Sequence, residues 1–358
     1  MNKIRIAIIG AGNISNTRHI PALKKLKNAR ISGVVGVKQS SLERTMKRHG
    51  IKNSLLLKRS GNFAERMGRS EWFRETDAVV IGAPPRDHFA LIEASLLNDK
   101  HVLVEKPMTM DKAEADSLIA LAKKRKKVFG VMHNFQFASG MLKLDDIINE
   151  GELGDVVSFF EFQLTNKNRR LPEWYNDLPL GLFYDEAPHF MYLLDKFGGT
   201  IKLENAHAQF NGNKGDNTPL LMSVNLRAGK VPANIFLNFE SPVCEWYFVV
   251  SGSKKIAFYD LFKDILVVLP TDNEHYAADI LKNSWRATFQ YWIRFFKNGV
   301  KLLTGNLLYG HDVVLGKFID AIATGKPIDG QISAEKGRST IMTMNDIDAI
   351  IKKKGSRR

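Results

Sequence analysis

The chain has 358 residues, 44% of them hydrophobic and 25% charged. This length suggests two domains or one large domain, and the composition is that of an ordinary globular protein. Its single cysteine, Cys244, excludes an intramolecular disulfide and a cysteine-based metal site within one chain. No apolar run approaches the ~20 residues that span a bilayer, and the N-terminus runs directly into a strand pattern, which leaves no room for a signal peptide. We therefore expect a soluble, cytoplasmic protein with no membrane partner.

The formal charge of +14 raises the possibility of nucleic-acid binding. Five positive charges lie in Lys123–Lys127 and five more in Lys352–Arg358. The first run falls where a helix should end, a position that favours cations, and the second is a terminal tail. Neither run has interleaved aromatic residues or a recognisable binding module. We expect no nucleic-acid partner, although the positive charge could help to attract an anionic substrate.

Short apolar strands alternate with helix-period segments over the first 132 residues. This alternation predicts a doubly wound, mostly parallel α/β sheet. The expected strands are Ile4–Ile9, Ile31–Val37, Asp77–Ile81, His101–Val104 and Val128–Met132.

The pattern changes after residue 132. A helix at Ser139–Asn149 and a strand at Val156–Leu164 precede several strand-like runs, and Asn166–Leu182 has the composition of a loop. We predict a Rossmann domain at 1–132 and an α+β domain at 133–358 with a large, open, mostly antiparallel sheet. The second domain would bind substrate and form oligomers, and its final helix could pack back on the first domain. The other expected elements are strands at 220–226, 234–239, 245–250 and 265–269 and helices at 310–323 and 334–352.

A glycine-rich turn follows the first strand. The run Gly10–Ser15 matches G-x-G-x-x-G except at its last position, where serine is also small. Such a turn lets a dinucleotide pyrophosphate approach the backbone at a helix N-terminus. The second strand is not followed by the acidic residue that binds a ribose hydroxyl; Lys38 and Ser40 stand there instead. This difference slightly favours NADP over NAD.

A second motif, Glu105-Lys106-Pro107, ends another strand of the same sheet. With it stand Pro84-Pro85 and His88, His133-Asn134-Phe135, Gly151–Asp155, and Asp185 followed by His189. Through this ordered series the chain resembles the Gfo/Idh/MocA oxidoreductases over nearly its whole length. It departs from them at Gln136, where the family often has arginine.

The resemblance implies a Rossmann domain joined to an open mixed sheet, and sugars, cyclitols or related polyols and carbonyl compounds as substrates. It assigns substrate and nicotinamide contact to Lys106, and proton transfer to His189 with Asp185 as its partner. Independently, residues four apart share one helix face, and histidine suits proton transfer near neutral pH. Asp185 could instead be a helix N-cap with Pro188 in the first turn. The cofactor-binding residues that we expect are Gly10, Gly12, Asn13, Ile14, Lys38, Ser40, Pro84, Pro85, His88, Glu105 and Lys106.

The resulting hypothesis is an NAD(P)-dependent dehydrogenase or reductase that transfers a hydride between the nicotinamide and a CH–OH carbon. The substrate could be a phosphorylated or nucleotide-linked sugar. The alternatives are reduction of a C=N or C=C bond on the same fold, and a dinucleotide-binding regulator or scaffold without turnover. We expect no metal, because a third and fourth ligand are not evident, and a homodimer or homotetramer, because an open sheet face is seldom left exposed. Candidate substrate-side residues are Asn134, Lys167, Arg169, Arg170, Trp174 and Tyr175.

Overall fold

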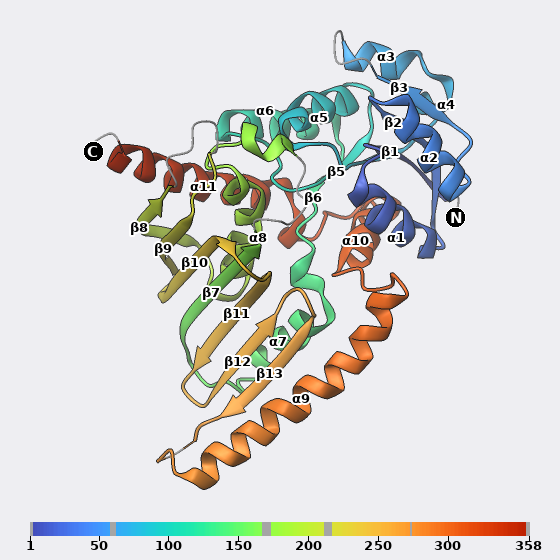
Figure 1. The fold of residues 1–358 in the computed structure, drawn as a ribbon. Coiled ribbons are helices and arrows are strands. Elements are labelled where there is room, and N and C mark those ends of the chain that lie inside the picture. The colour runs from blue at the N-terminus through green and yellow to red at the C-terminus, as the bar shows by residue number, and fades with distance from the viewer. Residues whose placement is uncertain (1–2, 58–61, 167–172, 211–216, 273, 356–358) are drawn as a thin grey trace. The chain divides into compact units, whose positions relative to one another are not determined.

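The computed structural model describes residues 3–57, 62–166, 173–210, 217–272 and 274–355 (Figure 1). Contacts within the chain divide it into two compact units. The first comprises residues 1–134 and 310–342, and the second comprises residues 135–309 and 343–358. The sequence-based division at residue 132 assigns the whole C-terminal part to the second domain instead. In the described part of the chain, no helix combines the length and apolar character that crossing a membrane requires.

The first unit contains a six-stranded sheet in the order β3-β2-β1-β4-β5-β6, with every paired neighbour parallel. This is the strand order of the dinucleotide-binding doubly wound fold. The predicted parallel α/β class is confirmed, with β3 as an additional edge strand. The strands are β1 (Ile4–Ile9), β2 (Ala29–Gly36), β3 (Ser54–Leu56), β4 (Ala78–Ile81), β5 (His101–Val104) and β6 (Phe129–Val131).

Helices accompany this sheet, and its central strands are apolar on both faces. All four residues of β4 are buried, as expected for a parallel strand covered from both sides. The helical segments are η1 (Ser15–His19), α1 (Ile20–Lys25), α2 (Gln39–His49), α3 (Phe63–Arg69), α4 (Glu71–Arg74), η2 (Pro85–Asp87), α5 (His88–Leu97), α6 (Lys112–Arg125), α10 (His311–Thr324) and η5 (Gly330–Ile332), and α11 (Ala334–Gly355) begins in this unit.

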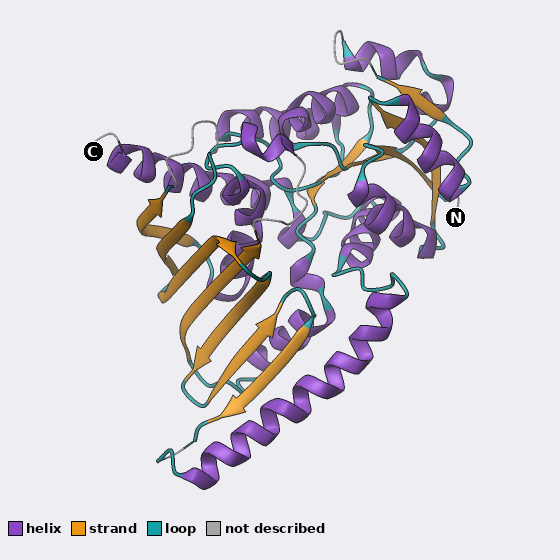
Figure 2. Cartoon of the chain, viewed as in Figure 1, coloured by secondary structure: helices purple, strands orange, loops and turns teal. Residues whose placement is uncertain are grey.

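The second unit is built on a seven-stranded sheet in the order β13-β12-β11-β7-β10-β9-β8 (Figure 2). Only the β7–β10 pair is parallel, so the predicted large, mostly antiparallel sheet is confirmed. Buried and exposed residues alternate along β10, which shows that one face of the sheet is covered and the other open. The strands are β7 (Val156–Asn166), β8 (Ile201–Gln209), β9 (Leu221–Ala228), β10 (Val231–Ser241), β11 (Glu245–Gly252), β12 (Lys255–Asp260) and β13 (Ile265–Pro270).

Two long helices of this unit were not assigned from the sequence. The first, α8 (Leu182–Gly198), lies against the covered face of the sheet, where Phe190 and Trp246 have ring centroids 5.0 Å apart. The second, α9 (Ala277–Leu303), runs along the edge strand β13 (Figure 1). The shorter segments are η3 (Phe135–Phe137), α7 (Ser139–Asn149) and η4 (Glu173–Asp177).

Candidate functional site

The glycine-rich turn has the geometry that its sequence predicts. Gly10 has a φ of +107°, and a Cβ there would lie 2.5 Å from the carbonyl oxygen of Gly82. A Cβ on Gly12, in contrast, would meet no atom within 4 Å. Ser15 is fully buried against Gly82, where an added Cβ would lie 2.8 Å from its Oγ. The turn is therefore tight at Gly10, open at Gly12 and closely packed at Ser15, which fits a bound pyrophosphate.

The neighbouring strand brings Lys38 and Ser40 to the same edge of the sheet. Strands β1 and β2 are parallel, so the segments after them leave the sheet on one side. Gly12 and Asn13 are exposed, as are Lys38 and Ser40 at the start of α2. These residues are placed where a dinucleotide would need them; their contacts with a cofactor stay a prediction.

His88 joins the loops that follow β4 and β5. Its Nδ1 lies 2.7 Å from the carbonyl oxygen of Pro107, and its Nε2 lies 2.9 Å from that of Ala83. The ring is completely buried, and this burial lowers the pKa of His88. The side chain thus holds Pro84 and Pro85 in a fixed loop beside the Glu105-Lys106 turn. Direct contact of these three residues with a cofactor stays a prediction.

Glu105 forms a buried cluster with two histidines that the sequence analysis did not select. Its Oε1 lies 2.8 Å from Nε2 of His19 and 3.7 Å from Nε2 of His311. Burial alone would raise the pKa of Glu105, but its interactions with His19 and His311 outweigh burial and hold this pKa well below its ordinary value. The cluster places a carboxylate directly before Lys106, whose side chain is half-buried.

The same three residues offer ligand atoms within 4.8 Å of one another, a spacing that a metal ion could use. The direct hydrogen bond between His19 and Glu105 accounts for this spacing without an ion. The expectation that the protein needs no metal stays a prediction.

In the second unit, Asp185 and His189 lie on helix α8. This helix begins at Leu182, after Gly181. The alternative interpretation of Asp185 as the N-cap is therefore wrong: Asp185 lies in the first turn and Pro188 lies inside the helix. His189 is buried, whereas Asp185 is half-buried.

Tyr192, one turn beyond His189, orients the imidazole. The Tyr192 Oη lies 2.7 Å from Nδ1 of His189 and accepts a hydrogen bond of 3.1 Å from the backbone N–H of Phe135. The Tyr192 hydroxyl oxygen can also accept a hydrogen bond from Nδ1–H of the neutral imidazole, and in that tautomer Nε2 carries no proton and can accept one. The aromatic rings of Phe135 and Trp246 contact the histidine edge-on, with centroids 4.8 Å and 5.3 Å away.

A row of buried polar side chains on β7 shares the covered face of the sheet with Trp246. Glu161, Gln163 and Thr165 are at most 1% exposed. Neither their side-chain polar atoms nor the indole N–H of Trp246 has a hydrogen-bond partner among the described residues. Buried polar groups are normally satisfied, so these atoms fit a polar ligand or water. Burial also raises the pKa of the Glu161 carboxyl well above its ordinary value, which favours the protonated form that can donate a hydrogen bond.

The other predicted substrate-side residues are spread over the chain. Asn134 is buried directly after β6, in the first unit. Trp174 and Tyr175 are half-buried in η4, in the second unit. Lys167, Arg169 and Arg170 lie outside the described residues. Their roles stay predictions.

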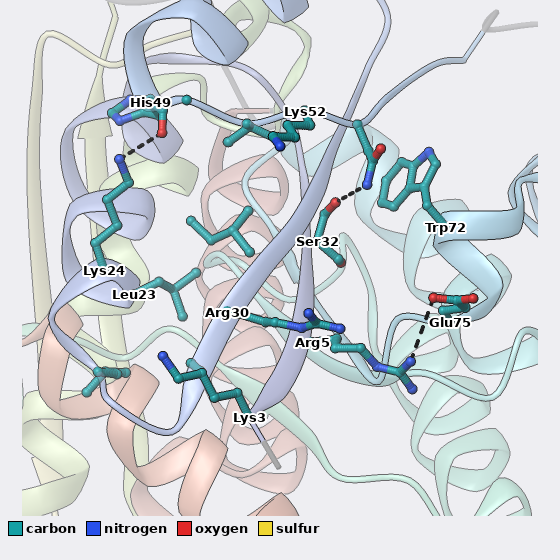
Figure 3. Close-up of a pocket in the computed structure, with 16 residues that line it drawn as sticks. Lys3, Arg5, Leu23, Lys24, Arg30, Ser32, His49, Lys52, Trp72 and Glu75 are labelled. Atoms are coloured by element: carbon teal, nitrogen blue, oxygen red, sulfur yellow. Dashed lines mark hydrogen bonds and ion pairs between the residues drawn. The ribbon is translucent and has the colours of Figure 1, made fainter.

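A basic hollow of about 530 Å³ lies elsewhere on the first unit (Figure 3). It is lined by the amino-terminal parts of β1 and β2 and by the residues before β3, whereas the glycine-rich turn follows the carboxyl end of β1. Lys3, Arg5 and Arg30 are among its lining residues, and Arg5 pairs with Glu75. None of the residues that the sequence analysis selected lines it.

Comparison with known proteins matches the N-terminal part of the chain to one family. Residues 4–133 match the model of the Gfo/Idh/MocA oxidoreductase family, described as an NAD-binding Rossmann fold. Within the first unit, these residues are therefore similar to the Rossmann domain of the Gfo/Idh/MocA oxidoreductases. The resemblance inferred from the motifs is thereby confirmed.

Proteins similar to this chain include an oxidoreductase that is named for a sugar substrate. It is 30% identical over 193 residues to the uncharacterized oxidoreductase YdgJ of Escherichia coli, covering 53% of this chain and 52% of YdgJ. It is 29% identical over 160 residues to dTDP-3,4-didehydro-2,6-dideoxy-alpha-D-glucose 3-reductase of Actinomadura kijaniata, covering 44% and 45% of the two chains. The alignments thus span about half of these relatives.

The fold likeness extends further than the sequence likeness. The structure of UDP-N-acetylglucosamine 3-dehydrogenase GnnA from Acidithiobacillus ferrooxidans superposes with a TM-score of 0.70 and covers 98% of both chains, at 16% sequence identity. At this identity the match shows that the two proteins share a fold.

Proposed function

We propose that this protein is an NAD(P)-dependent dehydrogenase or reductase acting on a CH–OH carbon of a sugar that carries a phosphate or a nucleotide. The observation that carries the proposal is His189, a buried histidine held by Tyr192 next to the ring of Trp246, whose indole N–H, like the buried polar atoms of β7, has no partner among the described residues. A proton-transfer group among unused hydrogen-bonding groups is what oxidation of a polyhydroxyl substrate requires. The Rossmann domain of the same chain belongs to an oxidoreductase family that binds NAD.

The cofactor would be held by the turn at Gly10 and Gly12, with Lys38 and Ser40 toward its ribose. When bound, its nicotinamide supplies the acceptor or donor of the hydride. Lys38 and Ser40, in place of an acidic residue, are the feature that favours NADP.

In the direction of alcohol oxidation, Nε2 of His189 accepts the hydroxyl proton, and the Tyr192 hydroxyl holds the ring from Nδ1. Lys106 donates a hydrogen bond to the reacting oxygen and stabilises negative charge on it. The buried Glu105 carboxylate, fixed by His19 and His311, positions the turn from which Lys106 projects. Asp185 shares the helix with His189 and orients either the imidazole or the substrate.

The β7 row would bind the hydroxyl groups of the sugar. A protonated Glu161 donates one hydrogen bond, Gln163 can donate and accept, and Trp246 donates through its indole N–H. Two of the similar proteins are named for reactions at position 3 of a nucleotide-linked hexose. We therefore expect position 3 of the sugar ring to be the reacting carbon here, and the net charge of +14 suits an anionic substrate.

The test is turnover of a panel of nucleotide-linked and phosphorylated hexoses with NAD⁺ and NADP⁺, followed by nicotinamide absorbance. At least one compound should react, and Lys106→Ala and His189→Ala should each lower kcat by about 100-fold or more. The matched controls are Lys202→Ala and His207→Ala on exposed positions of β8, which should react normally. Saturable cofactor binding with no turnover on the whole panel would instead support a regulator or scaffold.

A further inference from the structure

Helix α9 attaches to its own domain through polar side chains. The side-chain amide of Gln290 bonds both backbone groups of Val268 on the edge strand β13, at 2.9 and 3.0 Å. The side-chain amide of Asn298 donates to the carbonyl oxygens of Asp264 and Lys263, at 2.6 and 3.1 Å. Asn298 is the only buried residue of the 27-residue helix. The face toward the sheet is therefore the hydrophilic one.

The opposite face is apolar, aromatic and exposed. Trp285 is 74% exposed, Phe289 67%, Phe296 65% and Leu303 90%. These residues follow one another at intervals that keep them on one side of a helix, over a length of ~27 Å at 1.5 Å per residue. An exposed apolar patch of this extent marks an interaction surface. Its other members are Leu281, Trp292, Ile293, Phe295 and Val300.

The polar side of α9 is cationic, and Arg286 and Lys297 are the groove cations nearest its apolar face. Arg286, Arg294 and Lys297 of α9 line a groove of about 710 Å³ beneath the helix, together with Lys143 and Lys255. The one acidic residue in the groove lining, Glu152, pairs with Lys255. No carboxylate of the described residues forms an ion pair with the three α9 cations. The helix itself contains five basic residues and one acidic residue, Asp279.

We propose that α9 binds the surface of an anionic phospholipid bilayer, lying in the plane of the membrane. The tryptophans, phenylalanines and leucines enter the boundary between headgroups and acyl chains, and the flanking cations bind lipid phosphates. A large apolar face with aromatic residues, a basic polar face and insufficient hydrophobicity to span the bilayer are the properties of interfacial helices. This proposal replaces the sequence-based expectation of no membrane partner, because that expectation considered only spanning segments.

The charges favour a membrane over a second copy of the chain. If two α9 helices packed apolar face to apolar face, their basic residues would be brought together and would repel one another. Each helix has only one acidic residue to offset this repulsion. Anionic lipid headgroups neutralise the same cations. The paired aromatic side chains Trp292 and Phe296, with stacked rings 5.4 Å apart, also form a broader surface than the narrow seam of a helical pair.

The experiment is flotation of the full-length protein with vesicles of phosphatidylcholine alone and of phosphatidylcholine with 30% phosphatidylglycerol, a composition chosen as a typical anionic surface. We expect at least ~10-fold stronger partition into the anionic vesicles, and weaker partition at high salt. The triple variant Trp285→Ser, Phe289→Ser, Phe296→Ser and the charge variant Arg286→Glu, Lys297→Glu should each reduce it by at least ~10-fold. The charge control, Lys202→Glu with Lys230→Glu on exposed positions of the same unit, should bind as the parent does.

A measurement on the unchanged protein guards against variants that fail to fold. Brominated acyl chains should quench the tryptophan fluorescence of the bound protein, because Trp285 and Trp292 would lie at the acyl boundary. Equal partition into neutral and anionic vesicles, or absence of quenching, would overturn the proposal. The proposal would also be overturned if the parent formed an oligomer without lipid and did not bind vesicles, and if the triple variant were monomeric. In that case α9 would pair with a second copy of the chain.

Discussion

Alanine at Gly10 and at Gly12 should have opposite consequences, although the two glycines are two residues apart. At Gly10 the φ of +107° is unfavourable for an L-residue, by about 1–2 kcal/mol. The added methyl would also lie 2.5 Å from the Gly82 carbonyl oxygen, and such overpacking costs about 1–3 kcal/mol. We therefore expect Gly10→Ala to lower the free energy of unfolding by about 2–5 kcal/mol.

Gly12→Ala should leave the free energy of unfolding within about 0.5 kcal/mol of the parent, since its methyl meets no atom within 4 Å. The methyl would, however, occupy the space through which a pyrophosphate approaches the backbone. We expect the Kd for NADH or NADPH to rise by at least about tenfold. Gly330→Ala is the matched control, because its methyl also meets open space, and it should change neither quantity.

The assays are urea unfolding for stability and tryptophan-fluorescence titration for cofactor affinity. Unchanged cofactor affinity in a folded Gly12→Ala variant would refute the placement of the pyrophosphate at this turn. A Gly10→Ala variant as stable as the parent would show that the close approach to Gly82 is not a constraint.

Three further predictions concern buried side chains. The Glu161→Gln variant should gain stability relative to the parent as pH rises above about 4.5, by up to about 1.4 kcal/mol per pH unit. The reason is that the raised pKa keeps the folded carboxyl protonated while the unfolded one ionises. Urea unfolding from pH 5 to 8 measures this, and a constant difference in the free energy of unfolding between the two proteins would contradict it. Burial lowers the pKa of His133 to about 4, so the contribution of neutral His133 to the free energy of unfolding should be fully present above pH 6.5. This free energy should then fall by about 3 kcal/mol as pH drops through 4. The His133→Asn variant should not show this loss, and an equal loss in both proteins would argue against the prediction. The Tyr192→Phe variant should lower kcat at least about tenfold and change the pH dependence of kcat, because His189 loses the hydrogen-bond partner of its Nδ1. Steady-state kinetics measure this, and a pH dependence of kcat like that of the parent would remove Tyr192 from the mechanism.

The sequence was sufficient for the parallel sheet and the glycine-rich turn of the first unit because their signals are local. Strand–turn–helix alternation indicates the parallel sheet, and Gly10 and Gly12 stand directly after the first strand. The role of Ser15 as a small packing residue also follows from spacing alone, and the structure places it against Gly82.

The contacts missed by sequence reasoning join distant positions. His19 and Glu105 are 86 residues apart, and His311 comes from a helix near the end of the chain. The alternation along β7 predicted a strand, but it could not show that α8 covers the face bearing Glu161 and Gln163. A possible signal in the sequence was that Glu161 and Gln163 alternate with Phe160 and Phe162. In the structure the polar residues are the buried ones and the phenylalanines are exposed or half-buried, whereas a strand usually buries its apolar residues.

Helix α9 was missed for a different reason. It is rich in tryptophan, phenylalanine and isoleucine, residue types common in strands and of modest helix propensity. Its apolar face does not pack against the core of its domain. A prediction that looks for helices with one face toward the core therefore misses it. Its helical period becomes visible once Gln290 and Asn298 are recognised as the residues facing the sheet.

The central claim is that a nicotinamide cofactor bound at the glycine-rich turn reacts with a sugar held near Lys106 and His189. The most direct measurement is the nicotinamide absorbance when the parent protein, Lys106→Ala and His189→Ala are each mixed with cofactor and a reactive nucleotide-linked sugar. The account predicts turnover by the parent and a loss of about 100-fold or more in both variants. Near-normal rates in both variants would contradict it.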